Sequence, residues 1–228
     1  MNAQPINALV ADYVAGVLAQ PAKVLIDAHL EIVPESREWV QNLEAVAGHS
    51  LDNGPEEAIT NSEAMIADIL SAPEDLPEDL SVQDNSVLPN AVSARASTPK
   101  SDDWMPAALE QFVGLAGKDI PWRMKIPGVY VYKMDDVDGC EVMLLRIKPG
   151  SSVPTHTHEG RELALVLKGS FDDVTGHYAR GDVSVADSNV DHKPVAGMSE
   201  ECICFLINDA PVRFTGPVAR IVRSFLPN

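Results

Sequence analysis

Apolar residues in the N-terminal third of the chain recur at the spacing of an α-helix. Between residues 6 and 18 they fall three, four, seven and eight positions apart, which places them on one helical face. The same periodicity predicts further helices over residues 23–32, 35–47 and 56–71, with prolines and a glycine at the breaks. We therefore expect a small helical bundle over residues 1–72.

The pattern changes after Trp104 to short apolar or alternating segments of strand length. Turn signals such as Asp138-Gly139 separate these segments, which span residues 128–134, 142–147, 163–167, 183–186, 202–207 and 218–225. Many short strands with regular turns predict a β-sandwich or barrel, here a jelly roll, over residues 102–228. Residues 73–101 hold four prolines among acidic and small polar residues, which predicts a linker. The predicted fold class is α + β with two domains.

Charge narrows the choice of partner. The chain has 34 acidic and 17 basic residues, a net charge of −17, and residues 1–70 contain 11 acids against only Lys23 and Arg37, a net charge of −9. Such a segment repels phosphates, which argues against direct nucleic-acid binding, and it favours a basic protein partner. No apolar run approaches the length of a membrane span, and three cysteines do not make a disulfide framework. We expect a cytoplasmic protein without membrane contact.

The stretch from Gly150 to Gly169 concentrates candidate metal ligands. His156 and His158 lie two residues apart, so on a strand both side chains project from the same face. Glu162 follows four residues later, at the start of an apolar run of buried-strand length. Two imidazoles and a carboxylate suit zinc, iron, manganese or nickel, and a fourth ligand is expected from elsewhere in the chain.

The same stretch reads G-x5-H-x-H-x3-E-x6-G and resembles the first motif of the cupin superfamily. The resemblance implies a fourth ligand, a histidine on a later strand that follows a Gly-Asp turn, and His192 after Gly181-Asp182 fits this position. It thus implies one divalent metal ion, zinc by preference, held by His156, His158, Glu162 and His192. The second motif departs from the cupin pattern because it lacks the usual proline-glycine pair before the histidine and the later asparagine.

Both halves together resemble the ChrR-like anti-sigma factors, in which a helical anti-sigma domain precedes a cupin domain. The resemblance includes the four metal-ligand positions, Asp209-Ala210-Pro211, and the helical segments around Tyr13 and His29. It implies that the helical domain sequesters a basic sigma factor of the extracytoplasmic-function type, and that the metal-bound cupin modulates release in response to stress. It is also compatible with a homodimer formed through the cupin domain. The predicted contact surface is the apolar stripe of the first helix: Leu9, Val10, Tyr13, Val14 and Val17.

The helical half departs from the zinc-binding members of that family. Those domains carry H-x3-C-x2-C on the second helix, whereas the same positions here are His29, Val33 and Ser36. The first predicted helix contains no histidine either. We therefore expect no zinc in the helical domain and an ordinary helical role for His29.

The alternative is a cupin metalloenzyme, dioxygenase-like or isomerase-like, that acts on a small molecule. Cupins host many functions, so the fold alone does not decide. Open metal coordination would favour the enzyme, whereas four protein ligands in a closed shell would favour a regulator or a structural module. We assign no catalytic residue and prefer the regulator.

Overall fold

The computed structural model describes residues 4–55, 61–71 and 104–215. Its N-terminal part contains four helices, as the periodicity predicts: α1 (Gln4–Val14), α2 (Gln20–Ile32), α3 (Ser36–Asp52) and α4 (Ser62–Ser71). Pro21 lies in the first turn of α2, where the missing N–H has no helical acceptor to lose. Three predicted features lie outside the described residues: the start of the fourth helix at residues 56–60, the linker at 73–101 and the strand at 218–225.

The part after Trp104 is β-rich, as predicted, and begins with a helix that the periodicity did not reveal. This helix, α5 (Ala107–Val113), is followed by the 3-10 turn η1 (Gly117–Asp119). The strands are β1 (Arg123–Ile126), β2 (Val129–Lys133), β3 (Glu141–Ile147), β4 (His156–His158), β5 (Glu162–Lys168), β6 (Ser170–Asp172), β7 (His177–Ala179), β8 (Val183–Ala186), β9 (Val195–Ala196), β10 (Cys202–Asn208) and β11 (Val212–Phe214).

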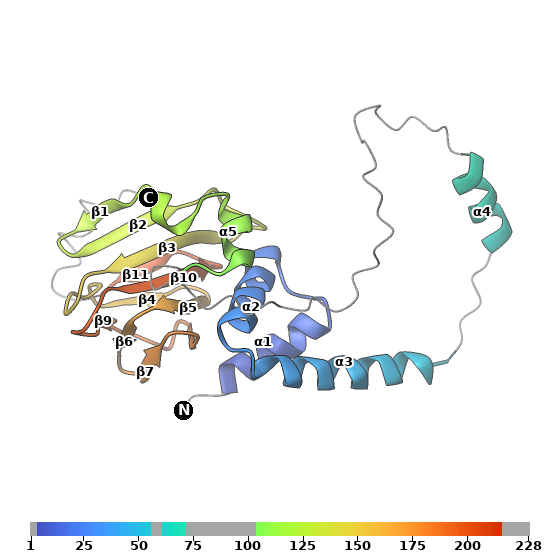
Figure 1. Cartoon of the computed structure of the whole chain (residues 1–228), viewed down its shortest axis with the longest axis horizontal. Coiled ribbons are helices and arrows are strands. Elements are labelled where there is room, and N and C mark those ends of the chain that lie inside the picture. Colours follow the sequence, from blue (N-terminus) through green and yellow to red (C-terminus); the bar gives the residue numbers. More distant parts are fainter. Residues whose placement is uncertain (1–3, 56–60, 72–103, 216–228) are drawn as a thin grey trace. The chain divides into compact units, whose positions relative to one another are not determined.

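These strands form three antiparallel sheets (Figure 1). The largest has the order β1-β2-β3-β10-β5-β8, and two small sheets, β11-β4 and β7-β6-β9, accompany it. Strands β3, β5 and β10 form the centre of the large sheet, where Phe205 is paired with Leu144 on one side and Leu165 on the other. Directly paired residues share a face, so these three side chains lie on one face of the sheet.

The two faces of the large sheet belong to different cores. On β5, Leu163, Leu165 and Leu167 join a core that also contains helical residues, whereas Ala164 and Val166 join a second core made by the β-rich part alone. The period of two along a strand explains this division. We call the helix-covered side the outer face and the opposite side the inner face.

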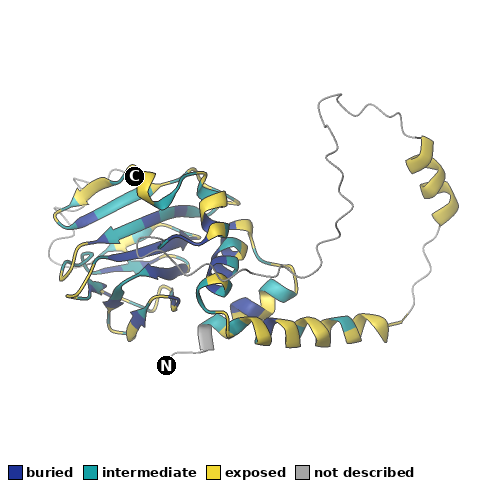
Figure 2. Cartoon of the chain, in the orientation of Figure 1, coloured by how far each residue is buried: buried dark blue, intermediate teal, exposed yellow. Residues whose placement is uncertain are grey.

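Helices α1 and α2 supply the cover of the outer face. Val10, Leu25 and Ile26 are fully buried, and they belong to the same core as Phe205 and Leu165. Figure 2 shows buried segments in dark blue on these helices and on the strands of the sheet. Helix α2 contacts β5, β10 and α5, and α1 contacts β8. We expect burial of these apolar side chains against the sheet to be the main stabilisation of the helical layer.

Polar contacts attach α2 to the β-rich part at both of its ends. At its start, the Gln20 N–H donates to Asp138 Oδ2 at 2.9 Å. Near its end, the Glu31 carboxylate accepts hydrogen bonds of 2.8 Å from the first two N–H groups of α5, those of Ala107 and Ala108. The carboxylate thereby satisfies helix-terminal donors that lack a partner within α5.

Gly181 allows α2 to approach the β7–β8 turn closely. Its φ is +93°, and a Cβ at this position would lie 2.6 Å from Val33 Cγ2 and 3.1 Å from Ile32 Cγ2. Both the backbone conformation and the lack of space therefore require glycine here. The Gly181 carbonyl accepts a hydrogen bond of 2.8 Å from His29 Nδ1, which is a second reason for the close approach.

The contacts divide the chain into two compact units. The described residues up to His49 form one unit with those from Trp104 onward, and the described residues from Ser50 to Ser71 belong to the other. None of the residues of α4 is buried. The division into domains at residues 1–72, 73–101 and 102–228 stays a prediction. Among the described residues, none of the helices has the length and apolar character needed to cross a membrane.

Candidate metal centre

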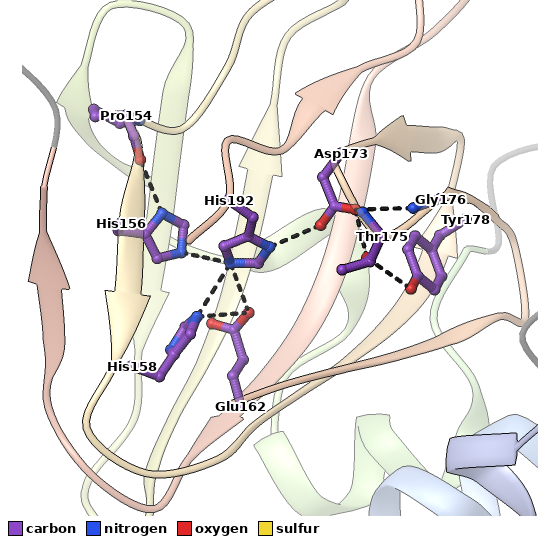
Figure 3. A network of polar contacts seen from close by, with 9 residues as sticks. All are labelled: Pro154, His156, His158, Glu162, Asp173, Thr175, Gly176, Tyr178 and His192. Carbon is purple, nitrogen blue, oxygen red and sulfur yellow. Dashed lines mark hydrogen bonds and ion pairs between the residues drawn. The ribbon is translucent and has the colours of Figure 1, made fainter. Parts of the chain in front are cut away.

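The structure brings together the four side chains that the sequence singles out as metal ligands (Figure 3). His156 and His158 project from β4, Glu162 opens β5, and His192 lies in the loop before β9. Mutual backbone hydrogen bonds of 3.0 and 2.9 Å between His156 and His192 hold this loop against β4. One ligand atom from each of the four buried residues lies within 4.8 Å of all the others.

The Nε2 atoms of the three histidines are as close together as the ligand atoms of one metal ion. His192 Nε2 lies 3.0 Å from His156 Nε2 and 3.1 Å from His158 Nε2. Glu162 Oε1 lies 3.8 Å from His158 Nε2 and 4.0 Å from His192 Nε2. Two nitrogen ligands about 2.05 Å from a tetrahedral zinc ion are roughly 3.3 Å apart, so the histidine spacing fits such an ion.

The outer hydrogen bonds of the histidines direct nitrogen lone pairs toward one another. His156 Nδ1 donates to the Pro154 carbonyl at 2.8 Å, and His192 Nδ1 donates to Asp173 Oδ2 at 2.7 Å. Each neutral ring then has its proton on Nδ1 and a lone pair on Nε2. The two Nε2 atoms are 3.0 Å apart, and their facing lone pairs repel unless a cation lies between them. This arrangement fits a bound metal ion and is unfavourable without one.

Asp173 is a part of the site that the sequence analysis missed. Its carboxylate accepts hydrogen bonds from the Thr175 N–H at 2.7 Å and the Gly176 N–H at 3.2 Å, in addition to the one from His192. Burial alone would raise the pKa of Asp173, but the hydrogen bonds from His192 and Thr175 lower it below the usual value. A carboxylate behind a ligating histidine orients the ring and makes it a stronger ligand.

Burial shifts the pKa values of three of the four candidate ligands. It lowers the pKa of His156 and of His158 to about 4, because a charged imidazole would lose its hydration. Burial also raises the pKa of Glu162 to about 7. His156 and His158 are thus neutral near pH 7, as ligation requires, and a cation would favour the ionised form of Glu162. Three imidazoles and a carboxylate fit a borderline divalent ion such as zinc, iron, manganese or nickel.

The residues predicted to contact a partner lie in different environments. Leu9 and Val10 are buried in the core between the helices and the sheet. Tyr13 and Val14 are partly buried against the same core, and the Tyr13 hydroxyl donates to Asp27 Oδ1 at 2.6 Å. Val17 is 69% exposed. The structure therefore does not present this stripe as one continuous surface.

Comparison with known proteins places this site in a family. Residues 110–212 match the family described as the ChrR cupin-like domain. The anti-sigma-E factor ChrR of Cereibacter sphaeroides is 31% identical over 219 residues, which cover 96% of this chain and 95% of that protein. The chain belongs to the ChrR-like anti-sigma factor family.

A solved structure agrees with this membership in the ChrR-like family. The crystal structure of Rhodobacter sphaeroides SigE in complex with the anti-sigma ChrR has a chain that is 28% identical to this one, with a TM-score of 0.65. The match covers 89% of this chain and 96% of that chain. The predicted family and the predicted fold, helices followed by a cupin domain, are both confirmed.

At the helical positions where this ChrR-like chain departs from the zinc-binding pattern, the structure shows a hydrogen bond. His29 is only 5% exposed, and its Nε2 lies 2.9 Å from Ser36 Oγ at the start of α3. Val33, which lies between them in the sequence, packs its side chain against Gly181. His29 therefore has a more specific role than that of an ordinary helical histidine, because its ring joins α2, α3 and the β7–β8 turn.

Proposed function

We propose that this chain is an anti-sigma factor that sequesters a sigma factor of the extracytoplasmic-function type in the cytoplasm. The observation that carries the proposal is its likeness, over nearly its whole length, to the anti-sigma chain of a solved sigma–anti-sigma complex. Relatives similar from end to end commonly share a partner class, which a shared cupin fold alone would not imply. The net charge of −9 over residues 1–70 adds long-range attraction for a basic partner.

The proposed sigma contact includes an exposed apolar surface on α4. Met65, Ile66, Ile69 and Leu70 recur with helical spacing on one face, and they are between 54 and 80% exposed. An apolar face this exposed on a short helix is typical of a surface that becomes buried in a complex. The predicted contacts of α1 remain part of the proposal: Val17 is accessible, whereas contact at Leu9 or Val10 requires α1 to separate from the sheet.

We propose further that His156, His158, Glu162 and His192 hold one divalent ion, zinc by preference. The buried quartet and the facing lone pairs of His156 and His192 support this assignment. Four protein ligands suit a site that stabilises a conformation, and the cavity beside three of them leaves room for the ion to take a further ligand. The predicted homodimer through the cupin domain stays a prediction.

The position of the metal centre supports a role in modulating release. Glu162 and Ala164 face the inner side of β5, and the alternate residues Leu163 and Leu165 pack in the helix-covered core. A shift of β5 at the metal centre therefore changes the surface on which α1 and α2 rest. If such a shift changes the stability of the docked helices differently in the free and the sigma-bound chain, it would couple the cupin domain to sigma binding.

A second candidate function is a cupin metalloenzyme acting on a small molecule. It is favoured by one observation, a cavity of about 1080 Å³ that reaches His156, Glu162 and His192. Such a cavity would admit a substrate to the metal. Full-length likeness to an anti-sigma chain makes the regulator the preferred function.

Transcription in vitro tests the preferred function. RNA polymerase with the chain's native sigma factor would be assayed on a promoter of that sigma, with increasing amounts of the full chain. We expect transcription to fall to background near one equivalent, and transcription by the housekeeping sigma factor to stay unchanged. If equimolar and tenfold excess chain leave both reactions unaffected, the anti-sigma function is wrong.

A further inference from the structure

The inner face of the large sheet borders a cavity that is larger than a metal site needs. Its volume is about 1080 Å³, at the upper end of the range of small-molecule pockets. The wall includes the metal-ligand residues His156, Glu162 and His192. Most of the other lining residues are apolar and come from several strands, among them Ile126, Val129, Met143, Leu145, Phe171 and Leu206, and charged residues such as Lys125, Glu159 and Arg213 also line the cavity.

One polar group in this apolar wall lacks a hydrogen-bond partner. Asn208 lines the cavity at the end of β10, is 2% exposed, and is paired across the strands with Glu162. Its Oδ1 is buried and accepts no hydrogen bond within the described part of the chain. Buried acceptors are normally satisfied, so this carbonyl oxygen next to a metal ligand is suited to a donor that enters the cavity.

We infer that the cavity binds a hydroxylated apolar small molecule, whose head group coordinates the metal and donates a hydrogen bond to Asn208. The inference rests on the proposed metal centre. The head group needs an oxygen lone pair for the metal and an O–H or N–H for Asn208, and its apolar body fills the space lined by Met143, Leu145 and Leu206. Burial of that body provides most of the affinity, and the head group fixes its orientation.

Occupancy of the cavity acts on the same sheet that carries the helices. The residues that would contact the ligand alternate along β3, β5 and β10 with residues of the helix-covered core: Met143 with Leu144, Ala164 with Leu165, and Leu206 with Phe205. A bound molecule would thus touch β5 and β10 on the face opposite to the one that α2 contacts. The chemical class of the bound molecule defines the kind of signal to which the proposed regulator responds.

Cobalt(II)-loaded full-length protein provides the test, because the visible absorption of cobalt reports a new ligand. The probes are octanohydroxamic acid and acetohydroxamic acid, which share a head group and differ by six methylenes. Each buried methylene is worth about a fourfold gain in affinity. We expect octanohydroxamic acid to bind at least about 100-fold more tightly, even if part of the chain stays in solvent.

Three variants separate the body of the ligand from its head group. Ala164→Leu fills part of the cavity and is expected to reduce the preference for the longer probe to less than about tenfold. Ala107→Leu makes the same change at an exposed position of α5 and should leave the preference unchanged. Asn208→Leu should weaken both probes by about five- to tenfold, because it removes the head-group acceptor and retains the apolar wall.

The outcomes distinguish this inference from the proposed metal centre. Cobalt uptake with equal affinities for both probes contradicts the apolar ligand, and unchanged affinities in Asn208→Leu contradict the head-group contact. A chain that takes up no cobalt contradicts the metal centre and the inference with it. Cobalt content is measured in every variant, and Val129→Leu replaces Ala164→Leu as the filling variant if the latter loses cobalt.

Discussion

His29 Nε2 lies 2.9 Å from Ser36 Oγ, at two positions where zinc-binding anti-sigma domains carry metal ligands. The opposite ring nitrogen, Nδ1, donates to the Gly181 carbonyl at 2.8 Å. Because a neutral imidazole has one donor and one acceptor, Nε2 accepts from the Ser36 hydroxyl. One neutral side chain thus joins the end of α2 to the start of α3 and to the cupin domain. A zinc ion at these positions is not needed for that connection.

Removal of this connection should loosen the helical layer. Ser36→Ala is expected to lower the free energy of unfolding by about 1 kcal/mol, and His29→Ala by roughly 2–3 kcal/mol, because the latter also leaves a cavity. Urea denaturation measures the loss, and hydrogen exchange shows whether amides of α2 are affected first. Gln41→Ala, at an exposed position of α3, is the control. Equal stability of His29→Ala and this control would refute the connection.

The same histidine predicts a pH dependence of stability. Burial lowers the pKa of His29 in the folded chain, although the hydrogen bond to Gly181 opposes the shift. The unfolded chain then binds more protons, so stability rises with pH in this range. The contribution of His29 is complete above the unfolded pKa of about 6.5 and is lost as the pH falls below it. Urea denaturation between pH 8 and 5.5 should show a smaller loss for His29→Gln than for the native chain, and parallel curves would exclude this role.

Loss of a metal ligand should abolish stoichiometric metal binding. In His156→Ala and His158→Ala the ion loses one of four donors, so metal content after purification should fall to roughly a tenth of the native value. Elemental analysis measures the content. His177→Ala removes a histidine that is exposed and paired with Asp172, and it should retain all of the metal. Full metal content in both ligand variants would show that the ion is bound elsewhere or not at all.

Asp173 should affect the metal without touching it. Asp173→Ala leaves the His192 ring without its hydrogen-bond acceptor, which is expected to weaken metal affinity by about 10- to 100-fold. Competition with a chromogenic chelator measures the affinity. Asp172→Ala is the matched control, because the neighbouring carboxylate is exposed and contacts His177 instead. Equal affinities of these two variants would argue against the positioning role.

The metal ligands could be predicted because they belong to recognisable sequence motifs. His156, His158 and Glu162 lie within seven residues, and His192 occupies a position that the cupin resemblance implies. Asp173 could not be found in this way, because only the fold brings its turn to His192. The strands β6, β7, β9 and β11 have two or three residues each, too few to show any periodicity.

The apolar stripe of α1 shows a different limit. Periodicity predicted which residues share a face, and the predicted helix is present. The periodicity could not show what covers that face. In the structure Leu9 and Val10 pack in the core that includes the sheet, whereas the apolar face of α4 is exposed. A hydrophobic pattern has the same appearance whether its partner is the same chain or another protein.

The most direct test of the anti-sigma account is the affinity of the full-length chain for its native sigma factor, measured by titration calorimetry with an α4 variant. We expect a one-to-one complex with a Kd below about 1 µM. The double substitution Ile66→Asp, Ile69→Asp should weaken it at least about 100-fold, because it places charge in the contact. Ala64→Asp adds charge on the opposite face of α4 and should have little effect. No detectable binding by the native chain would contradict the account, and an unchanged Kd in the double variant would exclude α4 from the contact.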